Sequence, residues 1–264
     1  MALLHVDFFS EVLGQCMEMD VLLPEKTRGQ IGAEGRADSG KCKTLYLLHG
    51  MSDNHTIWQR LTDVELYARE LGIAVIMPKA HLSWYTDMWR GGKYFTYISE
   101  ELPAICERFF GQLSPKREDR FVAGLSMGGY GAFKCALCAP QTFSRAASLS
   151  GAMDIATTCE EMHHDGEYEG TLWENVFGPA DQVRGSKNDL LAAAERLATE
   201  GKWQKPELYM WCGTEDFLYE ANLRMRDHLQ KLGYPLCYEE APGDHQWKYW
   251  GEKIRTVLEW LPLR

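Results

Sequence analysis

The sequence predicts an α/β fold, in which helices cover both faces of a mostly parallel central sheet. Short apolar runs alternate with segments of helical periodicity along most of the 264 residues, which is typical of strands joined by crossover helices. Hydrophobic residues make up 45% of the chain and charged residues 25%, as in ordinary globular proteins with a large core. We therefore expect a single domain over residues 1–264.

The first elements are expected at an edge of the sheet. Residues 3–9 and 15–23 alternate in polarity on either side of Gly14, which is the pattern of two antiparallel strands joined by a turn. Residues 27–43 are rich in Gly, Arg, Lys and Ser and predict a surface loop. Residues 44–48 form a continuous apolar run, which is typical of a strand buried on both faces.

The remaining elements alternate between helices and buried strands. Gly72 and Gly233 directly follow two of the helical patterns, as glycines that end helices do, and Pro78 follows one of the strands. Helices are expected over residues 57–71, 95–110, 129–139, 221–232 and 247–261. Further strands are expected over residues 73–77, 121–125, 146–150, 207–212 and 236–240.

One segment, residues 153–205, interrupts this alternation. It contains a single strong helical pattern, over residues 189–198. We interpret the segment as a small lid inserted at the rim of the functional site, where loops commonly determine selectivity. Its beginning is polar and mostly acidic, with Glu160, Glu161, His163, His164, Asp165 and Glu167.

The most informative motif is the G-x-S-x-G sequence centred on Ser126. It follows the strand expected over residues 121–125 and precedes a helix rich in small residues. A strand, this turn and a helix together form a nucleophile elbow, which holds a serine hydroxyl exposed above a sheet. Gly124 and Gly128 would provide the space that so sharp a turn needs. A strand-to-helix turn in which Ser126 only caps the helix is the alternative.

Two later loops supply partners that could activate this serine. Asp216 follows the strand over residues 207–212, and His245 follows the strand over residues 236–240. Because the carboxyl ends of parallel strands share one edge of a sheet, we expect both side chains near Ser126. Asp216 would hold the His245 ring, and His245 would take the proton of Ser126.

Each of these assignments has a competing interpretation. Asp216 could be the N-cap of the following helix, and His245 could be a surface histidine. Glu215 is an alternative acid, and Asp244 is a weaker one because it adjoins His245 in the sequence. His163 and His164 are expected to be solvated.

An oxyanion intermediate requires two preorganised donors. The backbone N–H of Met127 is expected to be one, because it directly follows the nucleophile. The N–H of Met51 is expected to be the other, because Met51 lies in the loop after the strand over residues 44–48. Gly50 would let this loop approach the substrate.

Aromatic residues gather after the strand that ends before Pro78. We expect Trp84 and Trp89 to border the substrate, with Trp247 at the edge of the same site. The alternative for the rings of this loop is that they only pack it against the core, and Trp247 could likewise belong to the core.

The net charge of −10 argues against nucleic acid or an acidic membrane as partner, because both need a basic surface. We expect a small-molecule ester as the binding partner, and the sequence is also compatible with a homo-oligomer. The first residues lack a basic segment followed by an apolar one, and no apolar run is long enough to span a membrane. A cytoplasmic location is therefore expected.

The eight cysteines are dispersed, and we expect free, mostly buried thiols. Cys135 and Cys138 form a C-x-x-C pair on an expected helix, but no second pair lies at zinc-site spacing. No metal site is therefore expected.

The assembled motifs resemble the esterase D-like group of α/β-hydrolases, which includes tributyrin and acetyl esterases, S-formylglutathione hydrolases and feruloyl esterases. The resemblance implies the α/β-hydrolase fold, serine esterase chemistry through an acyl-enzyme and no cofactor, and the tributyrin/acetyl esterase branch is the most similar. It rests on LLHGMSDN at residues 47–54, GLSMGGYGA at 124–132, CGTEDFL at 212–218 and GDHQW at 243–247.

The function expected from these observations is hydrolysis of short acyl esters, including acetyl or hydroxycinnamoyl groups on sugars. A thioesterase of the S-formylglutathione hydrolase type and an acyltransferase are alternatives. Residues 51–55 lack the longer loop with Cys and Thr that formylglutathione hydrolases usually carry. A non-catalytic binding protein is less favoured, because Ser126, Asp216 and His245 are all present.

Overall fold

The structure, a computed structural model, describes residues 1–27, 29–31, 35–36 and 40–263. Within these residues an eight-stranded sheet has the order β1-β2-β4-β3-β5-β6-β7-β8, which confirms the predicted fold class. The strands are β1 (Ala2–Ser10), β2 (Gln15–Leu23), β3 (Thr44–Leu48), β4 (Ala74–Pro78), β5 (Arg120–Leu125), β6 (Arg145–Leu149), β7 (Glu207–Gly213) and β8 (Leu236–Ala241).

The sheet is parallel except at one edge. β1 pairs with β2, and β2 with β4, in antiparallel register. All other neighbouring strands are parallel. The predicted edge hairpin is therefore confirmed, and Gly14 in its turn has a φ of +66°, in the left-handed region that favours glycine.

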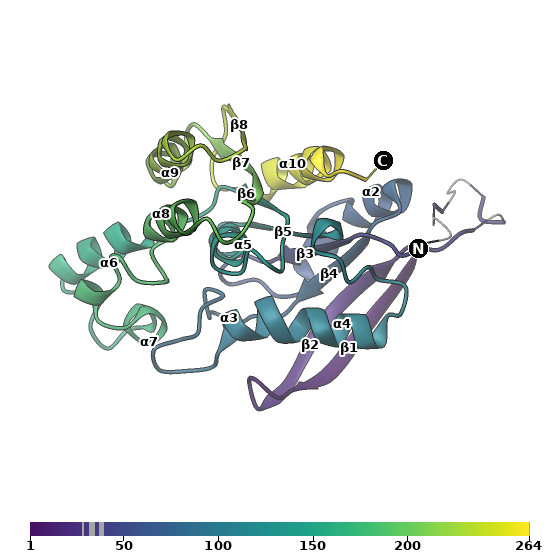
Figure 1. The fold of residues 1–264 in the computed structure, drawn as a ribbon, viewed down its shortest axis with the longest axis horizontal. Helices are drawn as coiled ribbons and strands as arrows, with labels where there is room; N and C mark the ends of the chain where they lie inside the picture. Colours follow the sequence, from purple (N-terminus) through teal and green to yellow (C-terminus); the bar gives the residue numbers. More distant parts are fainter. Residues whose placement is uncertain (28, 32–34, 37–39, 264) are drawn as a thin grey trace.

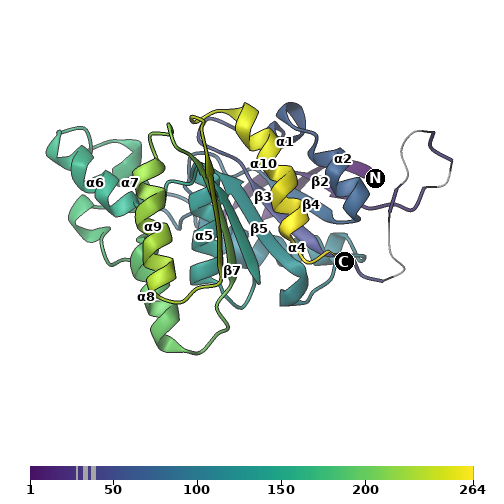
Figure 2. The ribbon, with the colours of Figure 1, turned by 90° about the horizontal axis from the view of Figure 1, so that it is seen from above.

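Helices cover both faces of the sheet (Figures 1 and 2). One face carries α1 (Ile57–Leu61), α2 (Val64–Leu71) and α10 (Trp247–Trp260). The other carries α4 (Leu102–Phe109), α5 (Met127–Cys138), α8 (Leu190–Glu200) and α9 (Tyr219–Lys231).

The core lies in two layers, one on each side of the sheet. Along β3, Leu45 and Leu47 join the layer under α1, α2 and α10. Tyr46 and Leu48 join the layer under α5. Because successive residues of a strand point to opposite faces, a continuously apolar strand fills both layers.

Two predicted helices are interrupted. The helix expected over residues 57–71 breaks between α1 and α2, where Thr62 is extended and its hydroxyl accepts the Val64 N–H at 3.2 Å. The helix expected over residues 95–110 consists of α3 (Tyr94–Thr96), the π-helical segment η1 (Tyr97–Glu101) and α4. Of the other predicted elements in residues 73–261, each lies within two residues of its observed bounds.

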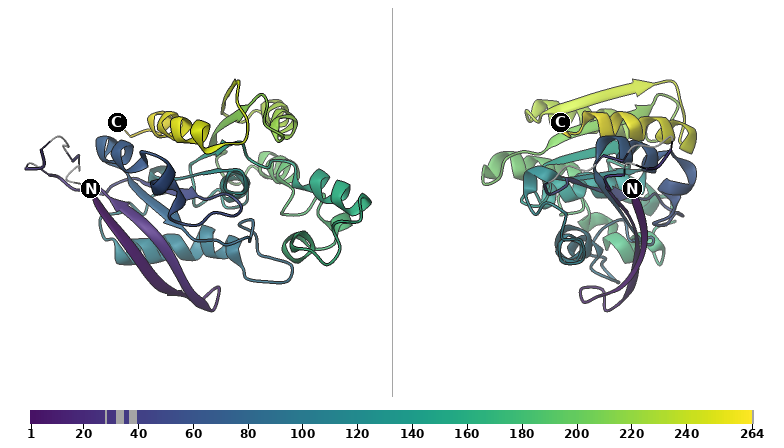
Figure 3. Two further views of the ribbon diagram at one scale, coloured as in Figure 1. Left: turned by 180° about the vertical axis from the view of Figure 1, so that it is seen from behind. Right: turned by 90° about the vertical axis from the view of Figure 1, so that its right-hand side faces the viewer.

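The segment 153–205 contains more helix than predicted. In addition to α8, it forms α6 (Ile155–His164), α7 (Leu172–Phe177) and the short turn η3 (Ala180–Gln182). Asp154 caps α6 by accepting the Thr157 N–H at 3.2 Å. Figures 1 and 2 and the left view of Figure 3 place α6 and α7 at the end of the molecule opposite the two termini.

The loop predicted over residues 27–43 is only partly visible, because residues 28, 32–34 and 37–39 lie outside the described residues. Its other residues include isolated bridges from Thr27 to Gly35 and from Cys42 to Leu113. A short turn, η2 (Arg117–Asp119), precedes β5.

All eight cysteines are free thiols, four of them buried and only Cys16 exposed. Among the described residues, none of the helices combines the length and apolar character needed to cross a bilayer. Nor do His, Cys, Asp or Glu side chains of that part of the chain gather in a group of three suited to a metal ion.

Candidate active site

Ser126 occupies a strained turn between β5 and α5. Its φ is +51°, a conformation that non-glycine residues adopt rarely and that concentrates at functional sites. The Ser126 N–H donates to the carbonyl of Leu149 at 3.0 Å, and the Ala152 N–H donates to the Ser126 carbonyl at 3.3 Å. The end of β6 therefore holds the backbone of the predicted elbow in place.

Both elbow glycines lie where a side chain would not fit. A Cβ at Gly124 would come within 2.4 Å of the Gly128 backbone. A Cβ at Gly128 would lie 2.5 Å from the carbonyl oxygen of Leu48. These contacts are with backbone atoms, which cannot move aside as a flexible side chain can. Close backbone approach is thus the physical reason for both glycines.

The side chains of Ser126, His245 and Asp216 meet at the carboxyl ends of β5, β8 and β7. His245 Nε2 lies 3.0 Å from Ser126 Oγ, and His245 Nδ1 lies 2.8 Å from Asp216 Oδ2. With Nδ1–H donating to the carboxylate, Nε2 is free to accept from the serine hydroxyl. The predicted convergence of a hydroxyl, an imidazole and a carboxylate is present.

The Asp216 carboxylate is buried, with no exposed side-chain surface. Burial alone raises its pKa, but hydrogen bonds from His245, the Leu218 N–H and Ser150 outweigh burial and lower it below the ordinary value. Oδ1 accepts the Leu218 N–H at 2.9 Å while Oδ2 faces His245. Asp216 is thus ionised at neutral pH, as a group that orients an imidazolium must be.

The two competing acids lie elsewhere. Glu215 is exposed to solvent, and its N–H donates to the carbonyl of Gly243 at 3.0 Å. Asp244 accepts from the Gln246 side chain at 2.5 Å. His163 and His164 are exposed on α6, as expected of solvated residues.

The loop after β3 approaches the elbow closely. A Cβ at Gly50 would lie 3.8 Å from Ser126 Cβ and 2.6 Å from the side chain of Leu125. Met51, the next residue, is half exposed, and its N–H has no hydrogen-bond partner among the described residues. Met127 is the first residue of α5, so its N–H lacks a partner within the helix.

A buried histidine fixes this loop. Because His49 Nε2 accepts the Ala80 N–H at 3.0 Å, the proton is on Nδ1, which donates to the carbonyl of Gly50 at 2.8 Å. The Tyr85 hydroxyl donates to the carbonyl of His49 at 2.8 Å. Burial lowers the pKa of His49 to about 4, so the ring stays neutral near pH 7. Apart from the position of His49 beside Gly50, no pattern in the chain indicates this role.

The predicted substrate-contacting tryptophans occupy three different environments. Trp84 is 5% exposed and packs against Trp173 with ring centroids 4.9 Å apart. Trp89 is 56% exposed and lines a cavity of about 670 Å³ beside α7. Trp247 packs edge-on against Trp58 at 5.1 Å. Burial favours the packing role for Trp84, and contact of the other two with substrate stays a prediction.

Two rings cover the histidine. Phe217 is 76% exposed, and its ring lies 4.7 Å from that of His245. The ring of Trp250 packs edge-on against the His245 ring, with centroids 4.8 Å apart. Trp250 belongs to none of the sequence motifs, whereas Phe217 directly follows Asp216 in one of them. Phe217 and half-exposed Met51 are thus apolar side chains that lie beside the site.

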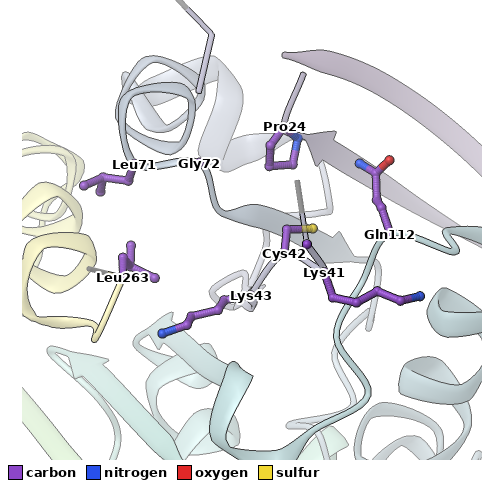
Figure 4. A pocket seen from close by; sticks show the side chains of 9 residues that line it. Pro24, Lys41, Cys42, Lys43, Leu71, Gly72, Gln112 and Leu263 are labelled. Carbon is purple, nitrogen blue, oxygen red and sulfur yellow. The ribbon is translucent and has the colours of Figure 1, made fainter. Parts of the chain in front are cut away.

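A separate cavity of about 150 Å³ lies near the amino ends of the parallel strands β3 and β4 (Figure 4). Lys43, directly before β3, lines it together with Lys41, Cys42 and Leu263. Since Ser126 follows the carboxyl end of the parallel strand β5, this cavity does not belong to the site around Ser126.

This fold and this site together define a serine hydrolase of the α/β-hydrolase fold, and comparisons with known proteins identify the family. The family "Putative esterase" matches residues 10–261. An acetyl esterase of Caldicellulosiruptor saccharolyticus is 30% identical over 265 residues, which cover 99% of this chain and 98% of that protein. The chain therefore belongs to this esterase family, and it is a carboxylic ester hydrolase.

Two solved structures from Staphylococcus aureus are similar over the full chain. The fluorophosphonate-binding serine hydrolase FphF has a TM-score of 0.85 and 34% identity, covering 100% of this chain and 98% of FphF. The S-formylglutathione hydrolase FrmB has a TM-score of 0.84 and 33% identity, covering 100% of this chain and 99% of FrmB. Both similarities agree with the resemblance seen in the sequence motifs.

Proposed function

We propose that Ser126 is the nucleophile of this hydrolase, His245 its general base and Asp216 the group that orients His245. His245 Nε2 takes the hydroxyl proton as Ser126 Oγ attacks the ester carbonyl, and returns that proton to the leaving alcohol. Water then attacks the acyl-enzyme with His245 again as base, which releases the acid and restores Ser126. This proposal is supported above all by the two contacts of the His245 ring, 3.0 Å to Ser126 Oγ and 2.8 Å to Asp216 Oδ2.

The backbone N–H groups of Met51 and Met127 are the proposed oxyanion donors. The Gly50 turn lies against Ser126, and the Met127 N–H is at the start of α5, where the helix dipole also favours negative charge. Donors fixed before the reaction stabilise the intermediate without reorganisation.

The proposed substrates are small, uncharged acyl esters, such as acetyl or hydroxycinnamoyl groups on sugars. The 30% identity to an acetyl esterase supports an acetyl or similarly short acyl group. The exposed apolar side chains of Met51 and Phe217 suit an uncharged group near Ser126. With a net charge of −10, the protein is suited to a small-molecule partner rather than nucleic acid.

The helical segment 153–205 is proposed to border the substrate as a lid. Its α7 residues Trp173 and Phe177 pack on Trp84, with ring centroids 4.9 and 5.8 Å apart. This contact joins the segment to the loop after β4, which was expected to line the site.

A thioesterase of the S-formylglutathione hydrolase type is the second candidate. The 33% identity to FrmB favours it, while the short loop over residues 51–55 favours simple esters. An acyltransferase would require a site that excludes water.

Kinetics on p-nitrophenyl esters of increasing acyl length, acetylated and feruloylated sugars and S-formylglutathione test the proposal. We expect the highest kcat/KM for a short acyl ester and a drop of about a thousandfold or more in Ser126→Ala, with an unchanged circular dichroism spectrum. A clear preference for S-formylglutathione would select the second candidate. An active Ser126→Ala enzyme would exclude the serine mechanism.

A further inference from the structure

The strand β1 forms an open edge of the sheet. It is nine residues long and is the outermost strand (Figure 1), and within the described part of the chain no strand pairs with its outer side. The N–H and C=O groups on that side can bind a strand of another chain. The other edge strand, β8, has six residues and carries Glu239 and Glu240, charges of the kind that prevent such pairing. β1 is therefore the edge suited to a partner.

The core layer under α5 is incompletely covered along β1. Leu4 and Val6 of β1 pack against this layer but are only partly buried. Val21 and Met19, their neighbours on β2, are fully buried in the same layer. On the other face of β1, the side chain of Phe9 is 54% exposed. A strand added at this edge would therefore cover apolar surface on both faces of the sheet.

A second copy of β1 can pair with this edge in only a few antiparallel registers. Successive residues of a strand point their N–H and C=O groups to opposite sides, so the groups of two strands meet only when even-numbered residues face even-numbered ones. The register that pairs the whole of β1 is centred on Val6, which then lies on a two-fold axis. It places Ala2 opposite Ser10 and Leu4 opposite Phe8 of the second copy.

This register also brings complementary side chains together. His5 and Asp7 are exposed on the same face of β1, and each would lie opposite the other residue of the second copy. Leu3 would lie opposite Phe9 in the same way. A shift to the next permitted register would place His5 opposite His5, or Asp7 opposite Asp7, and like charges directly opposite each other are unfavourable. β1 is thus complementary to itself in the register centred on Val6.

The ring of His5 is already oriented by the neighbouring strand. Its Nδ1 donates to Asp20 Oδ1 at 2.6 Å, and Gln59 Nε2 donates to the other oxygen of that carboxylate at 3.1 Å. His5 Nε2 has no partner among the described residues. Because a histidine ring can donate from both nitrogens, Nε2 is available to the Asp7 carboxylate of a second copy.

We propose that the protein forms a homodimer in which two β1 strands pair antiparallel about Val6, so that two eight-stranded sheets become one continuous sheet. Each His5 then lies opposite Asp7 of the second copy, and the core layer under α5 continues across the axis. The two sites around Ser126 lie at opposite ends of the joined sheet, and β1 contributes no residue to either of them. The proposal therefore does not depend on the proposed function.

Sedimentation of the protein over a range of concentrations, up to roughly 100 μM, measures the dissociation constant of the dimer. His5→Asp puts a carboxylate opposite Asp7 on both sides of the axis and should raise this constant roughly tenfold or more. His5→Asp combined with Asp7→Lys restores opposite charges only in the register centred on Val6. This double variant should return to within about threefold of the wild-type constant.

Phe9→Glu tests the same surface without changing His5 or its contact with Asp20. It removes the apolar contact with Leu3 of the second copy and should also raise the dissociation constant roughly tenfold or more. Trp203→Glu is the matched control and should leave the dimer unchanged, since Trp203 is also an exposed aromatic residue but precedes β7, near the other edge of the sheet. All these variants should keep the wild-type kcat/KM within about twofold, which shows that they are folded.

A wild-type protein that stays monomeric over this concentration range would overturn the proposal, as would a dimer that Phe9→Glu leaves intact. A folded double variant that dissociates as readily as His5→Asp alone would overturn the register centred on Val6. If His5→Asp lowers the melting temperature, because it adds a charge beside Asp20, the result for Phe9→Glu decides.

Discussion

The carboxylate of Asp216 makes two contacts, one with the backbone of its own loop and one with His245. Capping and catalytic orientation were competing interpretations of Asp216. In the structure, Oδ1 accepts the Leu218 N–H before α9, and Oδ2 faces His245. The N-cap of α9 is Leu218, and no side chain caps that helix, so Asp216 is not its N-cap. The contact with the Leu218 N–H lies in the loop before α9 and helps to fix the oxygen that faces the ring.

Asp216→Asn should lower kcat/KM by roughly a thousandfold or more, because an amide N–H facing His245 Nδ1 favours the wrong tautomer. Glu215→Gln is the matched control: Glu215 is exposed, so its kcat/KM should stay within about twofold of the wild type. Steady-state kinetics on one ester compares the two. The reverse result would make Glu215 the acid.

Residues with a motif could be found from the sequence, and residues without one could not. Ser126, Asp216 and His245 each follow an apolar strand in a glycine-containing loop, a pattern that is local in sequence. The contacts of Trp250 with His245 and of His49 with Ala80 and Tyr85 depend on the packing of α10 and of the loop after β4. No spacing in the chain records those contacts, which arise from tertiary structure.

At the scale of elements, the turn at Ser126 combines a positive φ with backbone hydrogen bonds to Leu149 and Ala152. The elbow was predictable because strand, glycine turn and helix are contiguous. The breaks at Thr62 and in η1 were not, because long-range contacts accompany them. Glu101 of η1, for example, accepts the N–H groups of Glu11 and Val12 at the hairpin tip at 2.8 and 3.1 Å.

His49 should make stability depend on pH in acid. Its pKa is about 4 in the folded protein, below the ordinary value of 6.5, so between these pH values the unfolded chain binds a proton that the folded protein does not. The stability from this group is therefore complete above pH 6.5 and falls by about 3 kcal/mol as the pH drops to 4.

Denaturant unfolding of the wild type and His49→Asn between pH 4 and 8 measures this effect. The variant should be less stable at pH 7, because a buried hydrogen-bond network is broken, but it should lose less stability on acidification. Equal losses in both proteins would show that His49 titrates normally in the fold.

At the scale of the whole molecule, the segment 153–205 is fastened to the helix that follows the nucleophile. Lys134 of α5 is fully buried and its Nζ donates to Asn188 Oδ1. The Tyr130 hydroxyl donates to the Asn188 carbonyl at 2.8 Å. The sequence indicated only α8 in this segment, because α6 is polar toward its end and α7 has only six residues, too few to show a helical period.

Lys134→Met tests the buried ammonium group. Burial lowers the pKa of Lys134 to about 8, against an ordinary 10.5, so between these values the unfolded chain binds more protons. Wild-type stability should therefore rise by about 3 kcal/mol from pH 8 to 10.5 through this group. Lys134→Met should lack that rise. Lys187→Met, at a side chain that is 61% exposed, should keep it.

Active-site labelling tests the central claim most directly. After treatment with a fluorophosphonate, intact mass and peptide mapping should show one adduct per chain, on the Ser126 peptide, with loss of hydrolysis in proportion to labelling. Ser126→Ala should remain unlabelled and inactive. An adduct on a different residue that abolishes hydrolysis, or hydrolysis that survives full labelling of Ser126, would contradict the account.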